Sequence, residues 1–198
     1  MNKRQMQALE TKRKILQTAL ALFQEKGFSH VSVDEIIDKT NTSKGAFYNH
    51  FKSKHDIFFE KFKEIDQYYI NDVEPELAKL QFIEQKLHKF FEMQMDFIDE
   101  HFGWDVTRTI YEHELNVDKE SFFLNPNRPL YEVLTRLCDE AKEEGYFRQD
   151  IPTKSMVTVF ARAIRGMLYD WSIHQGTYSL TKEYKLLFHT VIAGLRQD

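Results

Sequence analysis

Hydrophobic residues in the first thirty positions recur with the period of an α-helix, and polar residues fill most of the positions between them. The recurring residues are Ile15, Leu16, Ala19, Leu22 and Phe23. Thr11 can cap the start of this helix, and Gly27 stands where a helix commonly ends in the left-handed conformation. The pattern therefore predicts a first helix between Thr11 and Gly27.

Two short helices are predicted next, separated by a tight turn. Ser32 and Glu35 have the spacing of a capping box, so a helix should begin there and run to about Thr40. Asn41 follows, and asparagine tolerates a positive backbone φ better than most residues with a side chain. Ser43 can cap a second helix of barely two turns. Two short helices with a third packed across them form a helix-turn-helix unit.

From Ser53 onward the hydrophobic pattern stays helical. Ser53 can cap a helix that runs to a break at Pro75, and further helices are predicted at about 76–102, 104–116, 128–145, 153–175 and 181–196. Seven glycines and four prolines in 198 residues are too few turn formers for a β-sandwich or a barrel. We therefore expect an all-α fold, with a three-helix helix-turn-helix domain over residues 1–55 and a helical domain over residues 56–198.

Charge is distributed unevenly along the chain. The whole sequence has a formal net charge of −4, which by itself argues against a nucleic-acid partner. Residues 1–55, however, hold ten lysines and arginines against five acidic residues, a net charge of +5, whereas the remaining residues carry a net −9. A basic head on an acidic body predicts a nucleic-acid-binding module joined to a domain that does not touch nucleic acid.

The second short helix has the side chains that a DNA-reading helix needs. Ser43 and Lys44 lie at its start, Gly45 allows a close approach of backbone to DNA, and Tyr48 lies one turn beyond Lys44. Ala46, Phe47 and Phe51 can face inward. The alternative is a solvated helix with ordinary surface cations. We assign to DNA contact Ser32, Thr42, Ser43, Lys44, Gly45, Tyr48, Asn49, His50, Lys52 and Lys54.

The stretch from Thr11 to Phe58 resembles the DNA-binding domain of the TetR (tetracycline-repressor-like) family of bacterial transcriptional regulators. The matching pattern is Ser43-Lys44-Gly45, two residues, Tyr48, one residue, His50-Phe51, one residue, Ser53-Lys54. Two departures lie in the turn, where this chain has Thr40-Asn41-Thr42 and the family usually has Ala-Gly-Val before the serine. The resemblance implies an all-helical homodimer with a C-terminal ligand pocket, and repression of a palindromic operator that is relieved when a small molecule binds.

Two hydrophobic stripes near the C-terminus suit a four-helix interface between subunits. Ala163, Gly166 and Gly194 would allow the helices to approach closely. The alternative is an ordinary core within one chain. The residues assigned to the homodimer contact are Phe160, Ile164, Leu168, Trp171, Leu187, Phe188, Val191 and Leu195.

Aromatic residues and methionines between the head and these last helices suggest a pocket for an apolar or aromatic effector. Residues at helical spacing can equally form plain core, and the arginines among them can be ordinary ion-pair partners. The residues assigned to the ligand pocket are Phe62, Phe91, Met95, Trp104, Arg108, Tyr111, Phe122 and Arg165.

Motifs of catalysis and metal binding are missing. None of the eight histidines has a glutamate three residues before it, and no phosphate-binding glycine motif or Gly-x-Ser-x-Gly sequence occurs. We expect no enzyme, no cofactor and no metal. The single cysteine, Cys138, excludes an intrachain disulfide, and no apolar run is long enough for a signal peptide or membrane span, so we expect a cytoplasmic protein. The alternative function is a non-catalytic helical adaptor that binds protein through the acidic body.

Overall fold

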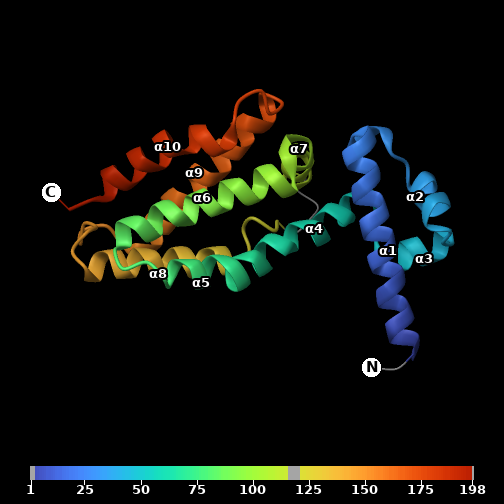
Figure 1. Ribbon diagram of the computed structural model, residues 1–198, viewed down its shortest axis with the longest axis horizontal. Helices are drawn as coiled ribbons and strands as arrows, with labels where there is room; N and C mark the ends of the chain where they lie inside the picture. The colour runs from blue at the N-terminus through green and yellow to red at the C-terminus, as the bar shows by residue number, and fades with distance from the viewer. Residues whose placement is uncertain (1–2, 116–120, 198) are drawn as a thin grey trace. The chain divides into compact units, whose positions relative to one another are not determined.

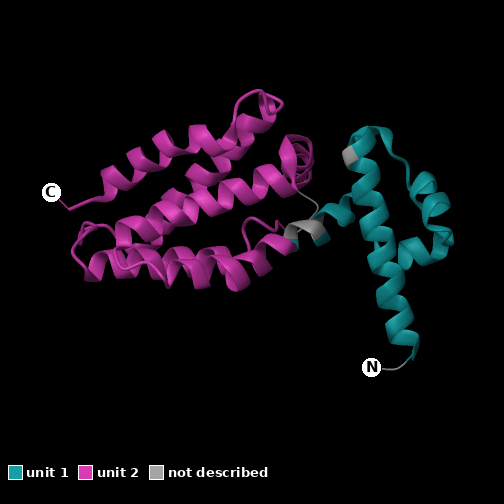
Figure 2. Ribbon diagram, in the orientation of Figure 1, with its two compact units in different colours: residues 1–63 teal, residues 64–198 magenta. Residues whose placement is uncertain are grey.

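The N-terminal unit is built on one long helix with the helix-turn-helix packed against it. The computed structural model describes residues 3–115 and 121–197, apart from the side chains of Gln24, Phe59, Lys61 and Phe62. The chain divides into two compact units, residues 1–63 and 64–198, coloured separately in Figure 2. The helices of the first unit are α1 (Lys3–Lys26), the single-turn η1 (Phe28–His30), α2 (Val33–Thr40), α3 (Lys44–His50) and the first part of α4 (Lys54–Tyr68).

Aromatic side chains form the core of the first unit. The Phe23 and Phe58 rings stack with centroids 4.9 Å apart, and Phe28 lies 4.7 Å from Phe58. Ile36 of α2 and Phe47 of α3 are fully buried as well. The three-helix arrangement expected from the sequence is therefore confirmed.

The first helix begins earlier than the sequence pattern predicts. It starts at Lys3, and Thr11 lies inside it, where its hydroxyl donates to the carbonyl of Gln7 instead of capping a helix start. Residues 5–10 are glutamine, methionine, alanine, leucine and glutamate, all good helix formers, so the helix extends without an internal boundary. This part of α1 is solvent-exposed, which explains why hydrophobic periodicity did not reveal it.

The second unit is a helical bundle, shown in Figure 1. After α4 the chain passes through the π-helix η2, and the remaining described helices follow in sequence order. They are η2 (Tyr69–Val73), α5 (Glu74–Leu77), α6 (Ile83–His101), α7 (Gly103–Glu114), α8 (Pro129–Glu143), α9 (Thr153–Ile173) and α10 (Leu180–Leu195). Helix α6 packs against α10, α8, α7 and α5, and α9 packs against α7, α8 and α10. The described residues contain no strand, and one isolated bridge joins Phe147 to Arg196.

Pro75 does not break the chain as the sequence predicts. It lies in the first turn of α5, directly after the π-helix Tyr69–Val73, and the helical path continues through it. The preceding turn widens into the π-helix Tyr69–Val73, and the real interruption comes at residues 78–82. The helix expected from residue 76 therefore begins at Ile83, whereas the later helices start and end within about two residues of their predicted limits.

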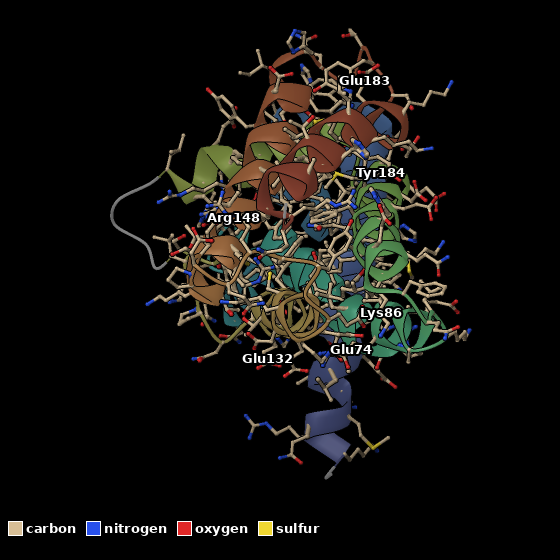
Figure 3. The ribbon with its side chains drawn as sticks, turned by 90° about the vertical axis from the view of Figure 1, so that its left-hand side faces the viewer. Glu74, Lys86, Glu132, Arg148, Glu183 and Tyr184 are labelled. Atoms are coloured by element: carbon tan, nitrogen blue, oxygen red, sulfur yellow. The ribbon has the colours of Figure 1, made fainter. Side chains whose placement is uncertain are left out.

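The hydrophobic stripes of α9 and α10 face the interior of a single chain. Phe188 stacks on Phe91 of α6 with ring centroids 3.9 Å apart, and Phe160 lies 5.2 Å from the same ring. Figure 3 shows side chains filling the space between these helices, with charged residues such as Glu132 and Glu183 outside. Six of the residues expected at a subunit contact are almost fully buried within the chain: Phe160, Ile164, Leu168, Trp171, Phe188 and Leu195.

The dimer assignment of these six residues is therefore corrected. A side chain whose surface is already covered by its own subunit has none left for a partner, so the alternative of an intramolecular core accounts for them. Leu187 and Val191 are half-buried and lie at the edge of this core. The large apolar side chains that α9 and α10 leave exposed are instead Val159, Tyr169, Ile173 and Leu186.

Within the described ranges no helix has both the length and the apolar character needed to cross a membrane. No cluster of histidine, cysteine or acidic side chains there could hold a metal ion.

Candidate nucleic-acid interface

The turn between α2 and α3 is held by its own side chains. Asn41 adopts the left-handed conformation at φ 52° and ψ 41°, as its position in the sequence predicts. The buried Thr40 hydroxyl donates to the carbonyl of Ile36 at 2.7 Å, and its oxygen lies 2.8 Å from the hydroxyl oxygen of Thr42. The turn is therefore kept although its sequence differs from the one usual in the family. Asn41 adopts the positive φ that a glycine would adopt there, and the contact between the Thr40 and Thr42 hydroxyls holds together the residues on either side of it.

Both short helices begin at the predicted serine caps. The Ser32 hydroxyl oxygen accepts the N–H of Glu35 at 3.1 Å, and the Ser43 oxygen accepts the N–H of Ala46 at the same distance. Each cap satisfies one of the unpaired N–H groups at a helix start and leaves its serine exposed. The beginning of α3 is therefore fixed in place on the surface of the unit.

Helix α3 separates a buried face from a polar exposed face. Phe47 is fully buried and Phe51, just after the helix, nearly so. Tyr48 is 47% exposed, with its ring edge-on to Phe47 at 5.3 Å. Lys44, Gly45 and Asn49 are exposed on the same side, and His50 is half-buried. This is the arrangement of a helix that enters a DNA groove with one side and packs with the other.

Lys44 is held only loosely within the unit. Its ammonium lies 3.0 Å from an Asp34 carboxylate oxygen, and this contact raises the pKa of Lys44. Both side chains are mostly exposed, and an exposed ion pair contributes little to stability because water and salt screen it. Lys44 can therefore exchange Asp34 for a phosphate or a base edge at little cost.

A surface groove of about 410 Å³ runs beside Tyr48. It is lined by η1 and the start of α2 on one side and by the junction of α3 and α4 on the other, and Lys52 and His55 are among its residues. Ser29 and His30 of η1 also line it, and neither is among the residues that the sequence pattern assigns to DNA contact. A helix of a single turn has no hydrophobic periodicity, so the only available signal was a serine and a histidine beside a predicted helix start.

Lys54 is directed into the unit, contrary to its expected role as a DNA contact. Its ammonium donates to the carbonyls of Phe28 at 2.8 Å and Val31 at 2.9 Å, and it lies 4.2 Å from the centre of the Phe28 ring. Burial lowers the pKa of Lys54. Its hydrogen-bonding capacity is largely used inside the chain, so we correct Lys54 from a phosphate ligand to a residue that joins α4 to η1. The remaining assigned residues lie on or next to the exposed side of α3 and stay predicted DNA contacts.

The residues expected to line one ligand pocket are spread over separate parts of the second unit. Phe91 and Met95 are fully buried in the core. The centre of the Phe122 ring lies 3.8 Å from the central carbon of the Arg128 guanidinium. Trp104 packs tightly against Gly176 in the turn after α9. The side chain of Phe62 lies outside the described part.

The two arginines assigned to that pocket are held by groups of the chain itself. Arg108 pairs with Asp105 at 3.3 Å and Glu112 at 3.5 Å. The Arg165 Nε donates to the carbonyl of Ala161, and the Tyr111 hydroxyl donates to the carbonyl of Arg165. The described residues thus favour the ion-pair alternative for Arg108 and a helix-packing role for Arg165.

The comparisons with known proteins match this geometry. Residues 15–60 match the family model described as bacterial regulatory proteins, tetR family. The chain is 24% identical to the "Probable acrEF/envCD operon repressor" of Escherichia coli (strain K12), with 97% of this chain and 90% of that protein aligned. It is 43% identical over 58 residues to the HTH-type transcriptional regulator AcrR of Shigella flexneri, covering 29% of this chain and 27% of that one.

A solved structure extends the likeness over both units. The FadR protein of Thermus thermophilus, a TetR-family repressor in complex with lauroyl-CoA, superposes with a TM-score of 0.72 at 19% identity, covering 94% of this chain and 97% of that one. At this identity the likeness concerns the fold. With the match over residues 15–60 and the exposed polar side of α3, it leads to one conclusion: residues 15–60 are a DNA-binding domain of the tetR family of bacterial regulatory proteins, and the chain is a DNA-binding transcriptional regulator.

Proposed function

We propose that this protein is a homodimeric repressor that binds a palindromic operator through α3 and leaves it when a small, mainly apolar molecule binds the second unit. One observation carries the DNA-binding part. Lys44, Tyr48 and Asn49 form an exposed polar side on a helix whose other side, Phe47, is fully buried. The family consists of regulators, and we propose no catalytic role and a cytoplasmic location.

Dimerisation is proposed through the exposed side of α9 and α10. Val159, Tyr169 and Ile173 of α9 and Leu186 of α10 are large apolar side chains that the chain leaves in water. Burying them against a second copy would be favourable by about 25 cal/mol per Å² of apolar surface. A two-fold dimer presents two copies of α3, as a palindromic site requires.

Two observations support a mainly apolar effector. The Thermus thermophilus FadR structure holds lauroyl-CoA, a molecule with a long apolar chain. The interior of the second unit here is correspondingly rich in aromatic side chains, among them Phe90, Phe91 and Phe160. Release requires that the effector bind one conformation of the protein better than the one that binds DNA, and the operator must then weaken effector binding by the same factor.

A gel-shift experiment on fragments of the source genome, repeated at several salt concentrations, tests the DNA-binding part. Tyr48→Ala should reduce affinity for the selected fragment by about 1 to 3 kcal/mol without changing the melting temperature. Lys44→Ala should weaken binding, whereas Lys79→Ala serves as a matched control. Lys79 is 66% exposed and paired with Glu76 at 2.5 Å, as Lys44 is 64% exposed and paired with Asp34.

Two results would overturn the proposal. A helical adaptor would shift no fragment selectively. Unchanged affinity in both Tyr48→Ala and Lys44→Ala would show that α3 does not read DNA.

A further inference from the structure

The part of α1 that precedes the family-model match lies on the outside of the first unit. The match begins at Ile15, whereas α1 begins at Lys3. Every residue from 3 to 10 is exposed, and Arg13 and Lys14 are exposed as well. Figure 1 shows this part of α1 projecting past α3. Residues 3–14 are called the α1 extension below.

The α1 extension is strongly basic. It holds five lysines and arginines and a single acidic residue, Glu10, a net charge of +4 in a chain whose overall charge is −4. Its first turn contains no acidic residue, although the start of a helix favours negative charge. Four of its cations have no ion pair with any described residue: Lys3, Arg4, Arg13 and Lys14. These cations are therefore available to an anionic partner.

The base of the α1 extension is fixed beside the end of α3. The Lys12 ammonium donates to a Glu60 carboxylate oxygen of α4 at 2.8 Å and lies 5.9 Å from the centre of the Phe51 ring. Phe51 directly follows α3, and the next residue, Lys52, is an exposed predicted DNA contact. Because an α-helix rises about 1.5 Å per residue, Lys3 lies about 14 Å along α1 from Lys12. The α1 extension therefore begins next to the predicted DNA contacts and has the length of about four base pairs, at about 3.4 Å each.

We propose that the α1 extension binds the phosphate backbone of DNA next to the bases that α3 contacts. Its phosphate ligands are Lys3 and Lys14, about three helical turns apart on one side of α1, and Arg4 beside Lys3. Charge complementarity decides the partner, because duplex DNA carries one negative charge per about 1.7 Å of its axis. Contacts to phosphate carry no sequence information, so the α1 extension adds affinity and not selectivity. The proposal rests on the DNA contact proposed for α3.

Salt dependence of DNA binding by the full chain tests the proposal. The double variant Lys3→Gln with Lys14→Gln removes two charges and keeps residues of similar helix propensity, so its melting temperature should equal that of the wild type. On a random duplex, the slope of log affinity against log salt should become shallower by about 1.8, because each lost phosphate contact accounts for about 0.9. Between about 50 and about 200 mM salt the wild type should therefore lose about twelvefold more affinity than the variant.

Two control variants separate position from charge and from apolar contact. Lys154→Gln with Lys182→Gln removes the same charge from exposed positions of the second unit and should keep the wild-type slope. Met6→Gln with Leu9→Gln keeps the charge of the α1 extension and removes its two exposed apolar side chains, 51% and 54% exposed. This variant should also bind DNA like the wild type.

Three results would overturn the proposal. The first is a wild-type slope in the Lys3 and Lys14 variant, and the second is an equal change of slope in the Lys154 and Lys182 control, which would make net charge the cause. The third is a loss of DNA affinity in the Met6 and Leu9 variant that exceeds the loss in the Lys3 and Lys14 variant. The α1 extension would then act through apolar packing against a protein.

The gel shift on genomic fragments separates this proposal from the proposed function. A selective shift by the wild type, together with an unchanged slope in the Lys3 and Lys14 variant, would reject the α1 extension as a DNA contact and leave α3 in place. A shallower slope without any selective shift would reject the proposed operator and leave the α1 extension as a phosphate-binding surface. Selectivity that disappears in the Lys3 and Lys14 variant would show contact with bases and overturn the stated class of contact.

Discussion

Replacing Lys54 with methionine separates folding from DNA binding within the first unit. The substitution keeps most of the aliphatic stem and removes the ammonium, which donates to the carbonyls of Phe28 and Val31 and lies over the Phe28 ring. Lys52→Met is the matched control, because Lys52 is two residues away and exposed. The structure predicts that the first variant loses stability and the second loses DNA affinity.

The magnitude follows from the contacts. A hydrogen bond to a charged group contributes about 1.5 to 3 kcal/mol, and a cation–π contact whose cation remains partly in water about 0.5 to 1 kcal/mol. Lys54 is half-buried, so water can replace part of what is lost, and we expect a net loss of about 2 kcal/mol. For a domain the size of the first unit this lowers the melting temperature by about 8 to 16 °C, and for cooperative unfolding of the whole chain by about 4 to 8 °C.

Two optical signals distinguish these cases. Both tryptophans, Trp104 and Trp171, belong to the second unit, whereas far-ultraviolet circular dichroism reports helices of both. If the first unit unfolds alone, the dichroism transition of Lys54→Met moves and the tryptophan fluorescence transition does not.

Salt dependence of binding to a random DNA duplex completes the assay. Removing a phosphate contact should reduce the slope of log affinity against log salt by about 0.9. We expect this reduction for Lys52→Met and no reduction for Lys54→Met. The reasoning is refuted if Lys54→Met melts like the wild type and shows the reduced slope.

Two further substitutions test the second unit. Leu186→Glu should give a monomer by light scattering with an unchanged dichroism spectrum, because the Leu186 side chain is exposed within one chain. The control variant Lys185→Glu changes an exposed neighbour and should remain dimeric. If both variants are dimers, the subunit contact lies elsewhere. Arg128→Met should lower the free energy of unfolding by about 3 to 5 kcal/mol, since it leaves the Asp66 carboxylate without its partner, and the double change with Asp66→Leu should recover part of this loss in urea unfolding. Equal losses in the single and double variants would show that the charge of Asp66 is not the cause.

Local signals predicted the DNA-binding unit well. Serine caps, a left-handed asparagine and an inward Phe47 are determined within a few residues of sequence, and the structure has all of them. Lys54 could not be placed in this way. Its partners lie 26 and 23 residues earlier in the chain, so only the folded unit shows that its ammonium points inward.

Hydrophobic periodicity is limited in a different way in the second unit. The stripe containing Phe160 and Phe188 correctly indicated which sides of α9 and α10 are covered. Periodicity does not say whether the covering surface belongs to the same chain or to another. Burial in the single chain answers that question, and it moves the proposed subunit contact to exposed residues such as Tyr169 and Leu186.

Helix α4 carries both the contact made by Lys54 and the ion pair made by Asp66. At the first turn of α4, Lys54 is bonded to η1, and at its last turn Asp66 is bonded to Arg128, just before the π-helix begins at Tyr69. Helix α4 runs without a break from Lys54 to Tyr68. The proposed coupling between effector and operator is therefore expected to depend on the ion pair that holds the last turn of α4.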